Sequence, residues 1–139
     1  MGCDIHCMLE IKRKGVWLMY NQCDIDRSYA LFTKMANVRT QPDIKPIAEP
    51  KGWPRDASEV AEIIMKDWDT DGHSHSWLDY REIIELFHWY KEQGGNLYDF
   101  DKEFGYLFGD SIYAWKLYPE DEDCRPWIED VRLVFFFDN

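Results

Sequence analysis

The last ten residues, DVRLVFFFDN, limit most strongly what this chain can fold into. Side chains of an extended strand point alternately to opposite faces of a sheet. Both faces of this segment would be apolar, with Val131, Leu133, Phe135 and Phe137 on one and Val134 and Phe136 on the other. A strand of this kind needs a covering layer on each side. The segment therefore predicts an internal strand of a sheet that is packed on both faces.

The amino-terminal residues predict a β-hairpin. CDIHCMLEI alternates as a strand over residues 3–11, KRKG supplies a turn, and VWLMY forms the second strand. On the first strand, Asp4 and His6 share one face, and Cys3 and Cys7 share the other. The hairpin thus places a carboxylate and an imidazole side by side.

Three helices are expected between the hairpin and the last strand. The first covers residues 27–38 with Asp26 as its cap, the second covers 57–67, and the third covers 77–92. One or two further strands are expected in residues 106–118, before an acidic loop.

Four prolines exclude regular structure from the segment TQPDIKPIAEPKGWPRDAS. It is either a strap across the surface or a lid that carries Glu49, Trp53 and Arg55. The fold class is therefore α+β, with a small, mostly antiparallel sheet, about three helices and a long Pro-rich loop. Residues 1–139 are expected to form a single domain.

Charge and composition narrow the classes of partner. The net charge of −11 argues against binding to polymeric nucleic acid, which needs a surplus of Lys and Arg. The longest apolar run is too short for a membrane span. The four cysteines fit a reduced, cytoplasmic protein better than a disulfide scaffold. Aromatic residues make up 17% of the chain, which is compatible with a ligand pocket or a homodimer interface.

The segment DTDGHSHSWLDYREI has the densest set of reactive side chains. Ser76 is expected to cap a helix that begins at Trp77, with Asp79 completing a capping box. Backbone N–H groups at a helix start attract anions, so Ser74, Ser76 and His73 are candidates for holding phosphate. His73 is also a candidate general acid or base. The alternative is a hydrogen-bonded surface loop.

A divalent metal is a second hypothesis for this region. Three aspartates at spacing two, ending at Asp71, match the first half of an EF-hand loop. The second half fails, because Leu78 stands where calcium needs a glutamate. The remaining metal hypothesis uses Asp4, His6 and Asp71 as ligands, and its alternative is a solvated acidic turn.

Two arginines are candidates for binding phosphate. Arg27 and Arg39 lie twelve positions apart, so they would share a broad face if one helix carried both. Pairing with the surplus acidic residues is the competing interpretation.

Five segments in order, MGCDIH, DRSYALFTKMANVR, PIAEPKGWPRDAS, DGHSHSWLDYREI and VRLVFFFDN, resemble a widespread family of small uncharacterised phage and prophage proteins. The resemblance spans essentially the whole chain. The pattern emphasises positions that match Asp4, His6, Arg27, Tyr29, Arg39, Asp71, His73, Ser76 and Trp77. It departs at Asp79, where the family usually has Thr. The resemblance implies a phage-derived protein that acts in the cytoplasm of a bacterial host.

By analogy with other small phage proteins, we expect an anti-defence protein that binds and hydrolyses a nucleotide-type immune signal, such as a cyclic dinucleotide. His73 would act as the acid or base, with Asp4 and His6 orienting it or holding a metal. Tyr29 and Trp77 would stack on the base.

Two alternatives stay open. One is a sponge that sequesters a cyclic nucleotide or an ADP-ribose-derived signal without chemistry. The other is an acidic protein that blocks a host protein surface. The hydrolase hypothesis requires Asp4, His6 and His73 to line one shared cavity.

Overall fold

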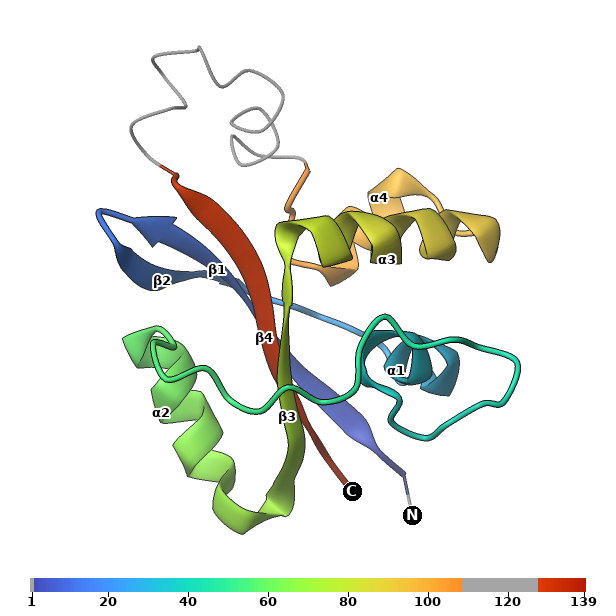
Figure 1. The fold of residues 1–139 in the computed structure, drawn as a ribbon, viewed down its shortest axis with the longest axis horizontal. Helices are drawn as coiled ribbons and strands as arrows, with labels where there is room; N and C mark the ends of the chain where they lie inside the picture. Colours follow the sequence, from blue (N-terminus) through green and yellow to red (C-terminus); the bar gives the residue numbers. More distant parts are fainter. Residues whose placement is uncertain (1, 109–127) are drawn as a thin grey trace.

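The computed structural model describes residues 2–108 and 128–139. Its four strands form one antiparallel sheet in the order β2-β1-β4-β3 (Figure 1). The strands are β1 (Asp4–Arg13), β2 (Val16–Gln22), β3 (Gly72–Asp79) and β4 (Asp130–Asp138). The helices are α1 (Tyr29–Ala36), α2 (Glu59–Trp68), a short 3-10 turn η1 (Asp69–Asp71), α3 (Tyr80–Glu92) and α4 (Leu97–Glu103). The α+β fold class expected from the sequence is confirmed.

The centre of the sheet is the strand β4. It pairs with β1 on one side and with β3 on the other, which confirms the internal strand expected from DVRLVFFFDN. The hairpin of β1 and β2 is also confirmed. Lys14 and Gly15 at its turn both have positive φ, at 51° and 75°. Two positive φ values suit a tight turn whose twist matches that of the strands.

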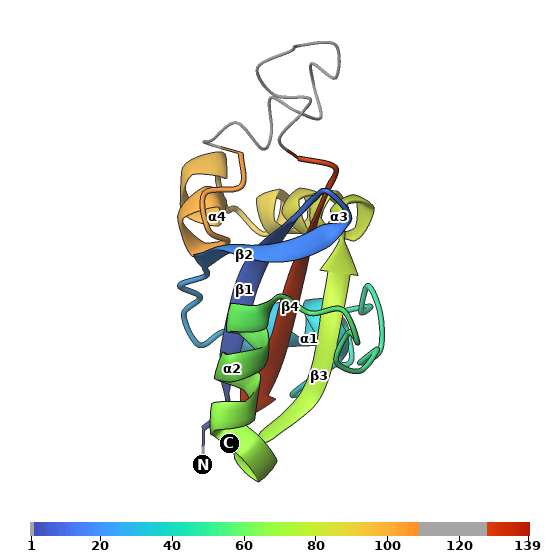
Figure 2. The same cartoon turned by 90° about the vertical axis from the view of Figure 1, so that its left-hand side faces the viewer.

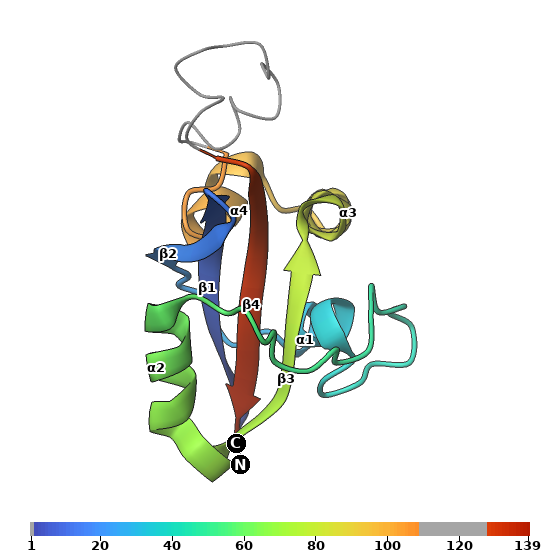
Figure 3. The same ribbon diagram turned by 60° about the vertical axis from the view of Figure 1, so that its left-hand side comes forward.

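One face of the sheet, here called the helix face, packs against α1, α3 and α4 (Figure 3). The layer between sheet and helices is apolar, and its large buried members include Leu9, Phe32, Met35, Leu78, Ile83, Leu86, Phe100, Phe104, Leu133, Phe135 and Phe137. This layer is the main hydrophobic core of the described residues.

The opposite face, here called the strap face, is covered by α2 and by the chain that leads into it (Figure 2). Residues 37–58 contain no helix or strand. They cross the edge strand β3, where the N–H of Gly52 donates to the carbonyl of His75 at 2.8 Å. The N–H of Lys51 donates to Oγ of Ser76 at 3.0 Å. These bonds support the interpretation of this segment as a strap.

Two helices begin slightly later than expected. The first begins at Tyr29 and not at residue 27, because the side chain of Ser28 caps it and Asp26 does not. The second begins at Glu59, after the cap Ser58.

The structure differs most from the sequence prediction at the third helix, for which the sequence predicts a start at Trp77. Residues 72–79 instead form β3, and the helix begins at Tyr80. The capping box exists one turn later than expected, between Asp79 and Glu82. Asp79 accepts from the N–H of Glu82 at 2.8 Å, and its own N–H donates to Oε1 of Glu82 at 3.0 Å. Ser76 is therefore a strand residue, and the expected anion site at a helix start there is wrong.

The carboxyl-terminal third adds one helix that was not expected. Helix α4 begins after Asn96, whose side chain accepts from the N–H of Asp99 at 2.8 Å. Of the strands expected over residues 106–118, positions 106–108 are turns, and the rest lies outside the described residues. The expected acidic loop and Cys124 lie outside them as well. None of the helices in the described ranges is long and apolar enough to span a bilayer.

Candidate functional site

Asp4 and Arg27 form a two-point ion pair at the end of the sheet where both termini lie (Figure 1). Nε and Nη2 of Arg27 each donate to one carboxylate oxygen of Asp4 at 2.9 Å. This hydrogen bond lowers the pKa of Asp4. A Cβ on Gly2 would lie 1.9 Å from Nη1 of Arg27, so a side chain at position 2 would require this guanidinium to move. Arg27 therefore binds an acid of this chain, as the competing interpretation held.

Tyr29 and Arg39 lie beside this pair. The hydroxyl oxygen of Tyr29 accepts from the N–H of Cys3 at 3.1 Å. The guanidinium of Arg39 lies 5.3 Å from the centre of the Tyr29 ring and covers one side of it. Arg27 and Arg39 do not share a helix, because α1 spans only residues 29–36. One side of the Tyr29 ring is therefore occupied by Arg39.

His6 and Asp138 form a close pair on the strap face. Nε2 of His6 lies 2.5 Å from Oδ2 of Asp138, and both side chains are largely buried. The His6 ring is held between Trp68, at a centroid distance of 4.2 Å, and Phe136, at 5.0 Å. A carboxylate that orients a histidine in this way can support acid or base chemistry.

His73 lies on the opposite face of the sheet. Its ring stacks beside Phe137, a member of the helix-face core, at 6.3 Å. Its two nitrogens lie 2.9 Å from Oγ of Ser74 and 3.0 Å from Oδ1 of Asn139. His6 pairs with one residue of β4 and His73 with the next, so their side chains point to opposite faces. The expected cavity shared by Asp4, His6 and His73 is wrong.

The histidine that does share a face with His6 is His75. A bulge in β3 places one extra residue between His73 and Ser76, and Ser74 within it has a φ of 54°. The His75 ring stacks on Phe136 at 5.4 Å, and its buried Nε2 has no hydrogen-bond partner within the described residues. Burial, and next the charge of His73, lower the pKa of His75. Both effects favour the neutral form of His75.

The expected metal site is wrong for the residues proposed. Asp4 binds Arg27, His6 binds Asp138, and Asp71 lies exposed in η1. Across residues 2–108 and 128–139, no three His, Cys, Asp or Glu side chains are grouped so that they could hold a metal ion.

The two serines proposed to hold phosphate are engaged elsewhere. Ser74 contacts His73, and buried Ser76 accepts from the strap. The ring of Trp77, in contrast to these serines, lines a hollow on the surface. The ammonium of Lys51 lies 3.9 Å from the centre of this ring.

This hollow, here called the strap hollow, has a volume of about 550 Å³ and lies between strap residues 54–56 and the sheet. Two indole rings contribute to its wall, Trp17 from β2 and Trp77 from β3. Lys12 and Arg55 add positive charge to it. The hollow thus combines flat apolar surfaces with cations.

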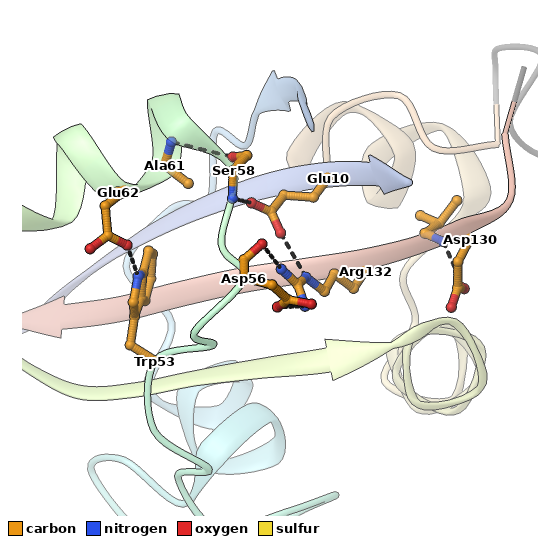
Figure 4. A network of polar contacts seen from close by, with 9 residues as sticks. Glu10, Trp53, Asp56, Ser58, Ala61, Glu62, Asp130 and Arg132 are labelled. Carbon is orange, nitrogen blue, oxygen red and sulfur yellow. Dashed lines mark hydrogen bonds and ion pairs between the residues drawn. The ribbon is translucent and has the colours of Figure 1, made fainter. Parts of the chain in front are cut away.

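An ion network around buried Arg132 lies beside the strap hollow (Figure 4). Nε of Arg132 donates to Oε1 of Glu10 at 2.6 Å, and Nη1 donates to Asp56 at 3.0 Å. The other oxygen of Glu10 accepts from the N–H of Ser58 at 2.7 Å. The Arg132 guanidinium stacks on Trp17 at 4.0 Å. This network fixes the strap to β1 and β4.

The acids of the strap hollow are already engaged. Asp56 binds the buried arginine, Asp79 caps α3, and Asp130 accepts a backbone N–H at 2.8 Å. Lys12 and Arg55 form no ion pair with any residue in the described ranges. Lys12, whose ammonium lies 5.8 Å from the centre of the Trp17 ring, and Arg55 are therefore the cations of the hollow without a carboxylate partner in the described ranges. They share the hollow with the negative charges of Asp79 and Asp130.

Sequence reasoning missed Lys12, Trp17, His75 and Asp138. Alternation along β1 does place Lys12 on the face of Asp4 and His6, so that signal was present. The other three depend on pairing between distant strands or on the bulge, which a single sequence does not reveal.

Comparisons with protein-family models, with curated proteins and with solved structures find no match to this chain.

Proposed function

We propose that this protein binds a nucleotide-type ligand in the strap hollow and holds it without cleaving it. The proposal rests on one observation: the hollow is lined by two indole rings and by two cations, Lys12 and Arg55, that have no carboxylate partner in the described ranges. The volume of about 550 Å³ lies within the range usual for small-molecule sites.

Each part of the hollow suits one part of a nucleotide. An indole offers a flat surface on which a base can stack. The Trp17 ring contacts Arg132 at 4.0 Å and Lys12 at 5.8 Å, the Trp77 ring contacts Lys51 at 3.9 Å, and these contacts hold the rings in place. Rings fixed in advance lose little entropy when a ligand binds. Arg55 can hold a phosphate through charge-assisted hydrogen bonds.

Sequestration is favoured over hydrolysis by what lines the strap hollow. No histidine, serine or cysteine of the described residues lines it. His6 and His73 belong to the other end of the sheet and to opposite faces. Together with the resemblance to phage proteins, this supports a sponge for a host signal such as a cyclic dinucleotide or an ADP-ribose derivative.

Hydrolysis is a second candidate, favoured by the distance of 2.5 Å between His6 and Asp138. An oriented histidine of this kind is the part that a phosphodiesterase-type reaction would use as acid or base. The third hypothesis, blockade of a host protein by the acidic segment 119–124, concerns residues outside those described.

One experiment separates the candidates. The protein is incubated with a panel of cyclic dinucleotides and ADP-ribose derivatives, washed, denatured by heat, and the released molecules are identified by mass. Sequestration predicts intact ligand, and His6→Gln returns as much as the unmodified protein. Altered product that disappears in His6→Gln would establish hydrolysis. Neither binding nor turnover across the panel would overturn both candidates.

A further inference from the structure

Two cysteines face each other across the first two strands. Met8 of β1 pairs with Gln22 of β2, and one step further along brings Cys7 opposite Cys23. The N–H of Cys23 donates to the carbonyl of Cys7 at 2.9 Å, so the pairing extends past the end of β2. Directly opposed residues of antiparallel strands have Cα atoms roughly 4.5–5.5 Å apart. Disulfides span about 4.4–6.8 Å between Cα atoms.

Both side chains lie on the helix face and differ in their access to solvent. Cys7 is 2% exposed within the core, and half-buried Cys23 packs against the same core. Burial, and next a contact with the thiol of Cys23, raise the pKa of Cys7. Both cysteines are reduced in this structure. The two sulfurs are therefore neighbours, and only one of them is within reach of a reagent in solution.

We propose that Cys7 and Cys23 are a reversible disulfide site, which closes when the protein meets a small disulfide oxidant such as oxidised glutathione. The thiolate of Cys23 attacks one sulfur of the oxidant, and one glutathione thiolate leaves. The thiol of Cys7 then gives up its proton, and its sulfur attacks that of Cys23, so the second glutathione thiolate leaves. Two protein thiols are oxidised, and one molecule of oxidant is reduced to two thiols.

The chain closed by this bond contains the whole hairpin turn. Lys12 and Trp17, which line the strap hollow, both lie between Cys7 and Cys23. Oxidation would restrain this wall of the hollow against β1. Formation of this disulfide depends on the pairing of β1 with β2 and not on the proposed ligand, so failure of either proposal would leave the other unaffected.

The test uses a Cys3→Ser/Cys124→Ser variant, which keeps only the two cysteines of interest. The folded variant is incubated with oxidised glutathione, the oxidant is removed, free thiols are alkylated in denaturant so that buried Cys7 is also reached, and the intact mass is measured. We expect the loss of two hydrogens, no alkylation, no retained glutathione, and a linked Cys7–Cys23 peptide after digestion. Reductant restores two alkylation sites.

Two controls make the result decisive. Adding Cys23→Ser is expected to leave one alkylated thiol and to abolish the linked peptide. The Cys3→Ser/Cys124→Ser variant oxidised in denaturant shows that the chemistry can proceed without the fold. If the folded variant stays reduced or stops at a glutathione adduct, and the denatured one closes, the native geometry forbids the bond and the proposal is wrong. If the serine variant does not fold, the same peptide map of the unmodified protein decides.

Discussion

The two faces of the sheet bury different chemistry. The helix face packs aliphatic and aromatic side chains against three helices. The strap face buries a smaller apolar cluster together with the paired charges of Glu10 and Arg132. It also buries Nε2 of His75, which has no hydrogen-bond partner within the described residues. Burying a charge is unfavourable unless it is paired, so a chain built only for stability would avoid this arrangement. The comparison indicates that the helix face relies on apolar packing and that the strap face relies on paired charges as well.

The largest loss of stability is expected when a substitution breaks the ion network of the strap face. Arg132→Ala leaves Glu10, which is fully buried, without its counter-charge. We expect a loss of about 3–5 kcal/mol in the free energy of unfolding, measured by urea denaturation. The double variant Glu10→Met/Arg132→Met should recover most of that loss, because no unpaired charge remains. A loss in the single variant below about 1 kcal/mol would contradict the importance given to this network.

The next residue of β4 tests the helix face. Leu133 is fully buried and points away from Arg132. Leu133→Ala should cost about 2–5 kcal/mol in the same denaturation experiment, because it leaves a cavity in a packed core. In contrast to Arg132→Ala, no change at Glu10 should rescue it. Rescue by a change at Glu10 would show that the two faces are not energetically separate.

The pH dependence of the unfolding free energy tests the strap face, because His75 lies on it. Its pKa is lowered in the folded protein, chiefly by burial, so the unfolded chain binds more protons as the pH falls through about 6.5. The contribution of His75 to stability is therefore present above that pH and is lost below it. His75→Phe should flatten the fall in unfolding free energy between about pH 7 and pH 5. An unchanged slope would show that His75 is not held neutral.

The smallest effect is expected for the exposed ion pair at the sheet end. Asp4 and Arg27 are each about half exposed, at 51% and 50%, where water screens the attraction. Asp4→Asn should barely move the urea midpoint, although it removes the same kind of contact as Arg132→Ala. A loss comparable to that of Arg132→Ala would mean that burial does not determine the strength of these pairs.

The sequence predicted the elements whose pattern is local. The hairpin and the internal strand β4 follow from alternation, and strand alternation placed Asp4 and His6 on one face. The region around β3 was misread because the bulge at Ser74 interrupts alternation, and because Trp77 and Tyr80 happen to have helical spacing. The capping signal was real but belonged to Asp79 and Glu82, three residues after the position expected.

The site was less accessible to sequence reasoning than the fold. The Glu10–Arg132 contact joins residues 122 positions apart, and His6–Asp138 joins residues 132 apart. Such pairs follow from strand order and register, which the sequence alone does not specify. Arg55 was noted as a residue of the Pro-rich segment, but its role in a hollow required the course of the strap.

The most direct test of the strap hollow is a calorimetric titration of three proteins with a cyclic dinucleotide and with ADP-ribose. The proteins are the unmodified chain, Arg55→Gln, and the control Arg81→Gln, which replaces an exposed arginine outside the hollow. We predict that at least one probe binds the unmodified protein. Arg55→Gln should weaken that binding by about tenfold to hundredfold, through loss of a charge-assisted contact, and Arg81→Gln should leave it unchanged. Failure of both probes to bind, or equal affinity for Arg55→Gln and the unmodified protein, would contradict the account.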